Sequence, residues 1–248
     1  MSNPFDLTGK TAIVTGANTG LGQGMAVALA EAGADVALVG RSRPKETVEL
    51  VEKTGRKAHV IMADLGSMEP IERIVSETRE NLGEIDILVN NAGIIKRNDS
   101  IDFTEEDWDA VMDINLNAPR RLAKRFLPGM IEAGWGRIVN FTGMNAMRGH
   151  LNRPHVSTSK HGILGLTRTL AVEFGQNGVT TNAISPGPIA SERDDPDFEA
   201  HLKKTLSSNP TRRQGTAAEV SAAVRLLVSD QGAYINGQMI QVNGGAAL

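Results

Sequence analysis

The chain of 248 residues contains no cysteine and only one tyrosine, Tyr234. Without cysteine the protein can form no disulfide, no thiolate nucleophile and no thiolate metal site. No apolar run approaches the roughly 18 residues of a membrane-spanning helix, and residues 1–10 lack the basic stretch and apolar core of a secretion signal. We therefore expect a soluble, cytoplasmic protein without a membrane partner.

A surplus of either charge is also missing. The formal net charge of -3 gives no basic face for a nucleic-acid backbone, so no nucleic-acid partner is expected. The histidines show no metal-ligand spacing and no metal is expected; they are His59, His150, His155, His161 and His201. The content of 40% hydrophobic and 22% charged residues is ordinary for a globular protein, and the length fits a single domain over residues 1–248.

Two apolar patterns alternate along the chain. Short apolar runs predict seven buried parallel strands at residues 11–15, 35–39, 58–62, 86–89, 137–141, 179–184 and 239–242. Stretches with helical apolar spacing predict helices at residues 21–32, 68–82, 105–133, 161–174 and 217–229. Strand and helix in alternation predict a Rossmann-like α/β fold, a doubly wound parallel sheet in a single domain.

Glycine and proline residues lie between the predicted helices and strands. Gly33, Gly83, Gly134 and Gly178 fall just past the ends of predicted helices, where glycine tolerates a left-handed backbone. Residues 191–209 are acidic and contain proline, which predicts a mobile insertion near the end of a strand.

The first predicted strand ends in a glycine-rich turn that leads directly into a helix. Gly16 permits a tight turn, Gly20 lets the backbone approach a phosphate and Gly22 allows close packing, while the free N–H groups of the helix favour negative charge. Glycines in loops are commonly no more than turns, but this position between strand and helix favours a dinucleotide site. Its residues are Gly16, Asn18, Thr19, Gly20, Leu21 and Gly22.

The residue after the second predicted strand bears on the choice of cofactor. An acidic side chain there would bond the ribose hydroxyls and repel a 2′-phosphate. The position holds Gly40, followed by Arg41 and Arg43, whose guanidinium groups could pair with that phosphate. The pattern favours NADP(H) over NAD(H); the alternative is that both arginines are solvated loop residues.

Several motifs together resemble the short-chain dehydrogenase/reductase family over nearly the whole chain. They are the glycine turn, Asn90-Asn91-Ala92-Gly93 after the fourth strand, Asn115, Lys160 and Pro186-Gly187. Residues 86–97 and 102–115 look most like the sugar-acid members of that family, such as deoxygluconate dehydrogenases.

The resemblance implies roles for individual residues. It implies that Asp64 and Leu65 hold the adenine, that Ile189 meets the nicotinamide carboxamide, that Asn115 holds a water in a proton relay and that Lys160 bonds the nicotinamide ribose. Asn91, Ala92, Gly93, Pro186 and Gly187 would complete the cofactor site. The resemblance also implies a homotetramer built through residues 105–133 and 154–174.

Two positions depart from the family pattern. The family has a tyrosine four residues before the lysine, which protonates the substrate oxygen, and a serine thirteen residues before that tyrosine. Here these positions hold Val156 and Gly143, and neither side chain can donate a proton. Tyr234 lies in a C-terminal segment that we expect to pack beneath the sheet, so no tyrosine replaces the missing one.

Another group could take over the proton transfer. The candidates are His155, His150, Thr142 and Lys160, and histidine is the side chain that most readily titrates near neutral pH. We therefore hypothesise a catalytic role for His155. The alternative is that His155, one residue from the catalytic face, only packs on the helix.

The loops after the fourth and fifth strands suggest the kind of substrate. Arg97, Arg148, His150, Asn152 and Arg153 cluster there, at the edge where an open α/β sheet binds its ligands. We expect Arg97, Arg148, His150 and Arg153 to bind a small anionic or polyhydroxylated substrate; the alternative is that they are solvated loop residues.

The sequence thus favours an NAD(P)-dependent oxidoreductase that acts on a hydroxyl or carbonyl of a small polar, sugar-acid-like substrate with an atypical proton donor. Two alternatives remain open. One is a lyase or isomerase that reuses the dinucleotide site. The other is a cofactor-binding protein without turnover.

Overall fold

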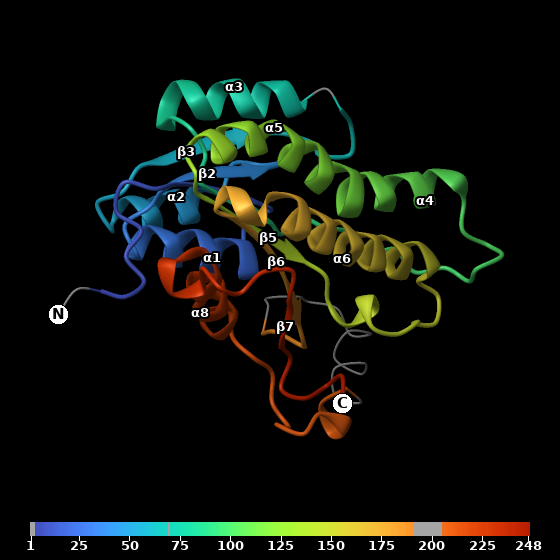
Figure 1. Ribbon diagram of the computed structural model, residues 1–248. Coiled ribbons are helices and arrows are strands. Elements are labelled where there is room, and N and C mark those ends of the chain that lie inside the picture. The colour runs from blue at the N-terminus through green and yellow to red at the C-terminus, as the bar shows by residue number, and fades with distance from the viewer. Residues whose placement is uncertain (1–2, 69, 191–204) are drawn as a thin grey trace.

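A parallel sheet forms the centre of the molecule (Figure 1). The computed structural model describes residues 3–68, 70–190 and 205–248, and within them the strand order is β3-β2-β1-β4-β5-β6-β7. The strands are β1 (Thr11–Thr15), β2 (Asp35–Gly40), β3 (Ala58–Met62), β4 (Ile87–Asn90), β5 (Gly136–Phe141), β6 (Val179–Pro186) and β7 (Met239–Val242). Every pairing is parallel, which confirms the predicted doubly wound α/β sheet.

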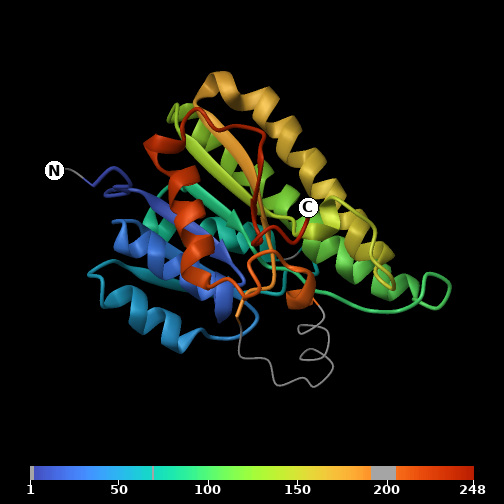
Figure 2. The ribbon, with the colours of Figure 1, turned by 90° about the horizontal axis from the view of Figure 1, so that it is seen from below.

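Helices cover both faces of the sheet (Figures 1 and 2). The helices are α1 (Gly20–Glu31), α2 (Lys45–Glu52), α3 (Pro70–Leu82), α4 (Glu105–Met112), α5 (Ala118–Glu132), α6 (Pro154–Phe174) and α8 (Ala217–Val228). One core cluster joins Val14 to Met25 of α1 and Val224 of α8. The other joins Ile138 to Phe126 of α5. Because both faces are covered, β1, β4 and β5 are buried along their whole length.

The predicted helices differ from the observed ones at three places. The sequence pattern missed α2, whose eight residues present only Thr47 and Val51 to the core. Helix α6 begins at Pro154, seven residues before its apolar spacing becomes visible at His161, because proline fits the first turn of a helix. The predicted helix 105–133 is interrupted by a π-helical turn, η1 (Asp113–Asn117).

Two predictions about loops have different outcomes. The glycines that follow helices adopt positive φ as expected: Gly33, Gly83, Gly134 and Gly178. Of the predicted insertion at 191–209, residues 191–204 lie outside the described residues, so its mobility stays a prediction.

The prediction that Tyr234 packs beneath the sheet is wrong. The side chain is fully exposed, with a relative accessibility of 102%. The next residue, Ile235, instead packs against the core. The sole tyrosine is therefore on the surface and plays no part in the site described below.

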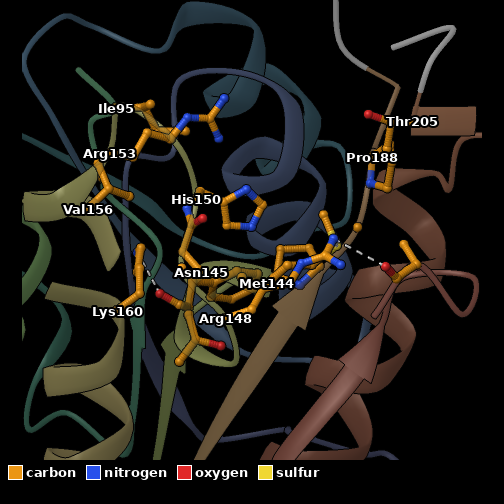
Figure 3. Close-up of a pocket in the computed structure, with 18 of the residues that line it drawn as sticks. Ile95, Met144, Asn145, Arg148, His150, Arg153, Val156, Lys160, Pro188 and Thr205 are labelled. Carbon is orange, nitrogen blue, oxygen red and sulfur yellow. Dashed lines mark hydrogen bonds between the residues drawn. The ribbon is translucent and has the colours of Figure 1, made fainter. Parts of the chain in front are cut away.

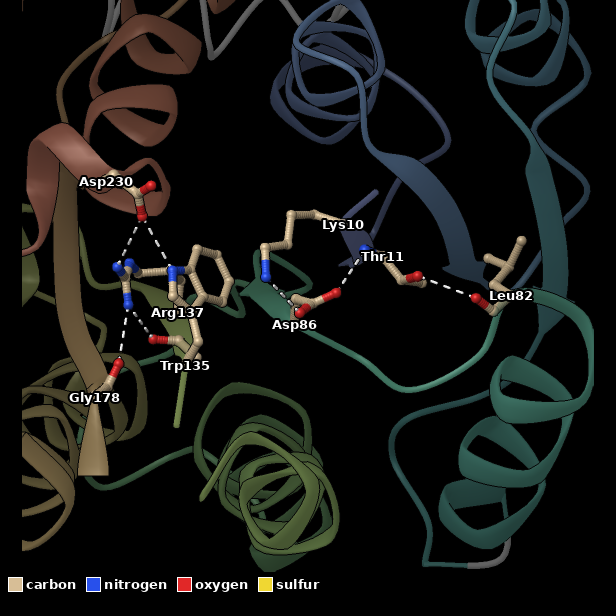
Figure 4. A network of polar contacts seen from close by, with 9 residues as sticks. Lys10, Thr11, Leu82, Asp86, Trp135, Arg137, Gly178 and Asp230 are labelled. Carbon is tan, nitrogen blue, oxygen red and sulfur yellow. Dashed lines mark hydrogen bonds and ion pairs between the residues drawn. The ribbon is translucent and has the colours of Figure 1, made fainter. Parts of the chain in front are cut away.

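A network of polar contacts joins residues at the amino-terminal ends of the central strands (Figure 4). The Asp86 carboxylate accepts hydrogen bonds from Lys10 Nζ at 3.0 Å and from the Thr11 N–H at 2.9 Å. The Trp135 ring lies 3.8 Å from Lys10 Nζ and 4.2 Å from Arg137 Cζ, two cation–π contacts. This edge lies opposite the carboxyl ends of the strands, so its role is structural.

Within the described part of the chain, no helix is both long enough and apolar enough to cross a bilayer.

Candidate active site

The glycine turn between β1 and α1 has the backbone that the sequence predicts. Gly16 and Gly20 adopt φ of 69° and 57°, in the left-handed region. A Cβ at Gly22 would lie 1.9 Å from the Gly16 carbonyl oxygen, so only glycine fits. Thr19, the N-cap of α1, makes no side-chain cap, which leaves the first N–H groups of the helix available to a phosphate.

Hydrogen bonds attach this turn to the segment after β4. Thr15 Oγ1 accepts from the N–H groups of Asn91 and Ala92, both at 3.0 Å. Asn91 Nδ2 donates to the carbonyls of Thr15 and Gly16 at 3.0 and 3.2 Å. The order of the strands reverses between β1 and β4, which is the place where open α/β sheets bind dinucleotides.

The end of β2 carries the residues that bear on cofactor choice. Asn18 Nδ2 donates to Ser42 O at 2.6 Å and to Ser42 Oγ at 2.8 Å. A Cβ at Gly40 would lie 2.1 Å from Asn18 Oδ1, so any larger residue would break this contact. Arg41 and Arg43 are exposed beside it.

The two residues predicted to hold the adenine differ in their exposure to solvent. Asp64 is exposed, and its Oδ1 accepts from the Gly66 N–H at 3.0 Å. Leu65 is buried in the core cluster that contains Phe126.

A cavity of about 940 Å³ opens at the carboxyl ends of β4, β5 and β6 (Figure 3). It brings together several predicted cofactor residues, namely Leu21, Asn91, Gly93, Lys160, Pro186 and Gly187. It also contains all four predicted substrate residues, Arg97, Arg148, His150 and Arg153. Ile189 is not among its lining residues and instead borders a separate cavity of about 180 Å³.

Lys160 lies on α6 and lines the large cavity. Its Nζ donates to the Phe141 carbonyl at 2.7 Å. Burial lowers the pKa of the Lys160 ammonium to about 8, because removal from water disfavours the charged form. A group with this pKa can both give and accept a proton in the physiological range.

Asn115 lies in the π-helical turn η1 and is buried. Its Oδ1 accepts from the Ile94 N–H at 2.8 Å, and its Nδ2 donates to the Ile94 carbonyl at 3.0 Å. The Asn115 side chain therefore fixes the backbone of the segment that follows β4 and lines the cavity. Such π turns are frequent at functional sites.

The two positions that depart from the family pattern both line the cavity. Val156 is fully buried and offers only methyl groups. Gly143 has φ 88° and ψ 174°, a region that is essentially restricted to glycine. The loop after β5 is therefore built around glycine, and a serine could not adopt this backbone without strain.

His155 and Thr142, two other candidates for the proton transfer, are placed less favourably than Lys160 for contact with a ligand in the cavity. His155 is fully buried but not among the cavity-lining residues, and its ring stacks on Phe103 with centroids 5.4 Å apart. Burial lowers the pKa of the His155 imidazole, an effect that Asp107 opposes. Thr142 lines the cavity, but its Oγ1 donates to the Ile184 carbonyl at 3.0 Å. His155 therefore packs against Phe103 and does not line the cavity, and its catalytic role stays a hypothesis.

Two arginines stand close together at the cavity. Burial lowers the pKa of the Arg153 guanidinium, and the positive charge of Arg97 lowers it further. Among the described residues neither guanidinium has an ion-pair partner. Their loops are joined by a hydrogen bond from the Asn98 N–H to the Asn152 carbonyl at 3.2 Å. Two adjacent unpaired cations favour an anionic ligand.

The sequence reasoning missed lining residues from distant parts of the chain. Asn145 follows β5, and Ala246 reaches the cavity from the C-terminal segment, where its carbonyl lies 3.5 Å from Arg148 Nη2. The only signal for the second was Gly244-Gly245, both of positive φ, which turn the chain back towards the site.

Comparison with known proteins agrees with this architecture. The family model described as enoyl-(acyl carrier protein) reductase, adh_short_C2, matches residues 16–247. The 2-dehydro-3-deoxy-D-gluconate 5-dehydrogenase of Dickeya dadantii is 38% identical over 98% of this chain and 97% of its own. The chain belongs to the short-chain dehydrogenase/reductase family.

Two solved structures give the same picture. A protein of Sinorhizobium meliloti superposes with a TM-score of 0.94 at 37% identity, over 98% of both chains. An Agrobacterium tumefaciens protein solved with bound NADP superposes with a TM-score of 0.89 at 38% identity, over 99% of both chains.

Proposed function

We propose that the protein is an NADP(H)-dependent oxidoreductase that interconverts a hydroxyl and a carbonyl on a small sugar acid. One observation carries the proposal: Leu21 of the glycine turn, Lys160 and the pair Arg97 and Arg153 line a single cavity. The names of the relatives point the same way, because the Dickeya enzyme acts on 2-dehydro-3-deoxy-D-gluconate.

The residues present fit a nicotinamide dinucleotide. The glycine turn is open at Gly20, where a Cβ would meet nothing within 4 Å, so a diphosphate can approach the backbone there. Gly40 offers no acid to the ribose, and Arg41 and Arg43 would pair with a 2′-phosphate. This supports NADP(H), with NAD(H) as the weaker ligand, and the NADP bound to the Agrobacterium relative agrees. When bound, the reduced cofactor supplies the hydride.

We propose that Lys160 exchanges the proton with the substrate oxygen. In the reduction its ammonium gives a proton to the substrate oxygen, and in the oxidation its neutral amine accepts that proton. A pKa of about 8 allows both directions near neutral pH. Without the tyrosine we expect turnover about 10²- to 10⁴-fold below that of relatives that keep a general acid at position 156.

Arg97 and Arg153 bind the substrate carboxylate. A guanidinium offers two parallel N–H donors that match the two oxygens of a carboxylate. An anion between the two arginines would also relieve the repulsion that lowers the pKa of Arg153. His150 and Arg148 border the same space and would contact the rest of the sugar chain.

Calorimetry with the purified protein tests the proposal. We expect NADPH to bind more tightly than NADH, and the NADP⁺ complex to bind D-gluconate. Arg97→Ala with Arg153→Ala should abolish gluconate binding and keep NADPH binding. Arg79→Ala, which removes an exposed arginine on α3, is the matched control and should change neither. Failure of the wild-type protein to bind any sugar acid would refute the substrate, and tighter NADH than NADPH binding would refute the cofactor.

We also propose that the chain assembles as a homotetramer through residues 105–133 and 154–174. Val172 on α6 is 85% exposed, an unusual position for a valine on a long helix. Contact with a second copy would cover this side chain.

A further inference from the structure

The irregular segment between β4 and α4, residues 91–104, carries Arg97 and is held by one carboxylate. Lys96 Nζ forms an ion pair with Asp107 Oδ1, and Asn98 Nδ2 donates to Asp107 Oδ2 at 3.4 Å. The two oxygens of Asp107 therefore contact the residues on either side of Arg97. Arg97 itself lines the cavity, whereas Lys96 and Asn98 do not.

Asp107 has a fixed place in the first turn of α4. Its N–H donates to Thr104 Oγ1 at 3.2 Å, the side-chain cap that begins the helix. The positive end of the helix dipole favours a carboxylate at this position. Phe103, directly before the cap, stacks on Trp108 and on His155 of α6, with ring centroids 5.7 and 5.4 Å apart. The start of α4 is thus packed on α6 and gives the carboxylate a rigid base.

Arg97 needs such a hold because like charges repel each other. Its side chain is exposed, and its positive charge lowers the pKa of the Arg153 guanidinium. A loop that is free to move would let Arg97 turn away from Arg153 into water. The two loops are joined by the Asn98 N–H, which donates to the Asn152 carbonyl at 3.2 Å, and that hydrogen bond would be lost as well.

We propose that Asp107 is a positioning residue that holds residues 96–98, so that Arg97 stands beside Arg153 before an anionic ligand arrives. The use of this arginine pair for a substrate carboxylate rests on the proposed function. The side chains of Asp107 and Lys96 are 22% and 40% exposed, and ion pairs with such exposure add little to the free energy of unfolding. The contact matters instead through the placement of Arg97, because a preformed site avoids the cost of ordering a side chain on binding. Since Lys96 neutralises the carboxylate, Asp107 does not compete with a ligand for the arginines.

A double-mutant cycle with Arg97 tests this role. We expect Asp107→Ala to raise the dissociation constant of D-gluconate from the NADP⁺ complex about two- to tenfold, the cost of ordering one long side chain on binding. In a chain that already carries Arg97→Ala, the same change should raise it no further, because Asp107 acts only through Arg97. NADPH affinity should not change. Asp109→Ala removes an exposed acid of the same helix that does not line the cavity; it is the matched control and should leave gluconate affinity unchanged.

Hydrogen exchange of the free protein tests the hold on the loop without any ligand. We expect residues 94–99 to exchange about fivefold faster in Asp107→Ala than in the wild-type protein or in Asp109→Ala, because the Asn98 N–H opens more often once the ion pair is gone.

The outcomes separate the inference from the proposed function. If the wild-type protein binds gluconate and Asp107→Ala binds it equally well, the role of Asp107 is refuted and the function stands. An equal loss of affinity with and without Arg97 would also refute it, because Asp107 would then act independently of Arg97. If the wild-type protein binds no sugar acid, the proposed function falls and the exchange rates decide the inference: faster exchange in Asp107→Ala supports the hold on the loop, and unchanged exchange refutes it.

Discussion

Val156 and Gly143 differ in how easily each could be changed back to the family residue. Val156 is one of the residues around a cavity of about 940 Å³ and lies in the regular helix α6, whose backbone accommodates any residue but proline. Gly143 has a backbone that a serine adopts only with strain. A tyrosine at position 156 would thus change one side chain, whereas a serine at position 143 would also change the path of the loop.

We expect Val156→Tyr to increase kcat/KM for carbonyl reduction by about tenfold or more, because a phenol beside Lys160 restores a general acid. Gly143→Ser should lower the free energy of unfolding by about 1–3 kcal/mol through backbone strain. Steady-state kinetics and urea unfolding of both single variants check this. Unchanged rates for Val156→Tyr, at unchanged NADPH affinity, would contradict it.

Lys160 should impose opposite pH profiles on the two directions of the reaction. Its pKa of about 8 means that the ammonium predominates below pH 8 and the neutral amine above it. Reduction needs the ammonium, so kcat should fall as the pH rises through 8. Oxidation needs the amine, so kcat should rise over the same range. Profiles that are flat in both directions would exclude Lys160 as the proton carrier, and Lys160→Met should be inactive.

At the scale of the elements, the strands were predictable and the interruptions were not. The strand runs were predicted to within two residues because the central parallel strands are largely continuous apolar segments. The prediction that all seven strands are buried is wrong for β3 and β7, which are only partly buried because they lie at the two edges of the sheet. The π turn at Asn115 does not visibly change the apolar spacing, so the sequence pattern did not predict it. The short helix α2 was missed for the same physical reason, because it buries too few side chains to show a period.

Asp86 should contribute to stability without affecting the site. Its carboxylate joins Lys10 and the Thr11 N–H at the amino-terminal edge of the sheet. Asp86→Ala leaves that N–H unpaired and should cost about 1–3 kcal/mol in urea unfolding. Glu84→Ala, which breaks an exposed pair with Arg79, should cost about 0–1 kcal/mol. A changed NADPH affinity in Asp86→Ala would show that the two edges of the sheet are coupled.

At the scale of the whole molecule, the sequence predicted the fold and the local glycine turn better than the contacts between distant loops. The glycine turn is a local motif, so its geometry follows from neighbouring residues. The approach of Arg97 to Arg153, the packing of His155 on Phe103 and the entry of Ala246 depend on loops that meet only in three dimensions. The exposed Tyr234 shows the same limit, since its neighbour Ile235 takes the core position.

The proposed tetramer is also a property of the whole molecule. Light scattering on the purified protein should give four times the mass of the chain. Val172→Glu should reduce that mass, because a charge would then face the interface. A monomer at all concentrations would contradict the assembly and leave the site unaffected.

We propose that the protein still carries out net hydride transfer, although it has neither the tyrosine nor the serine of the family pattern. The most direct measurement follows nicotinamide absorbance and substrate concentration together while the enzyme acts on sugar acids and their keto forms. We predict that NADP(H) is converted one for one with substrate. Substrate consumed without net cofactor change would indicate a lyase or isomerase, and cofactor bound without any reaction would indicate a binding protein; either result would contradict the account.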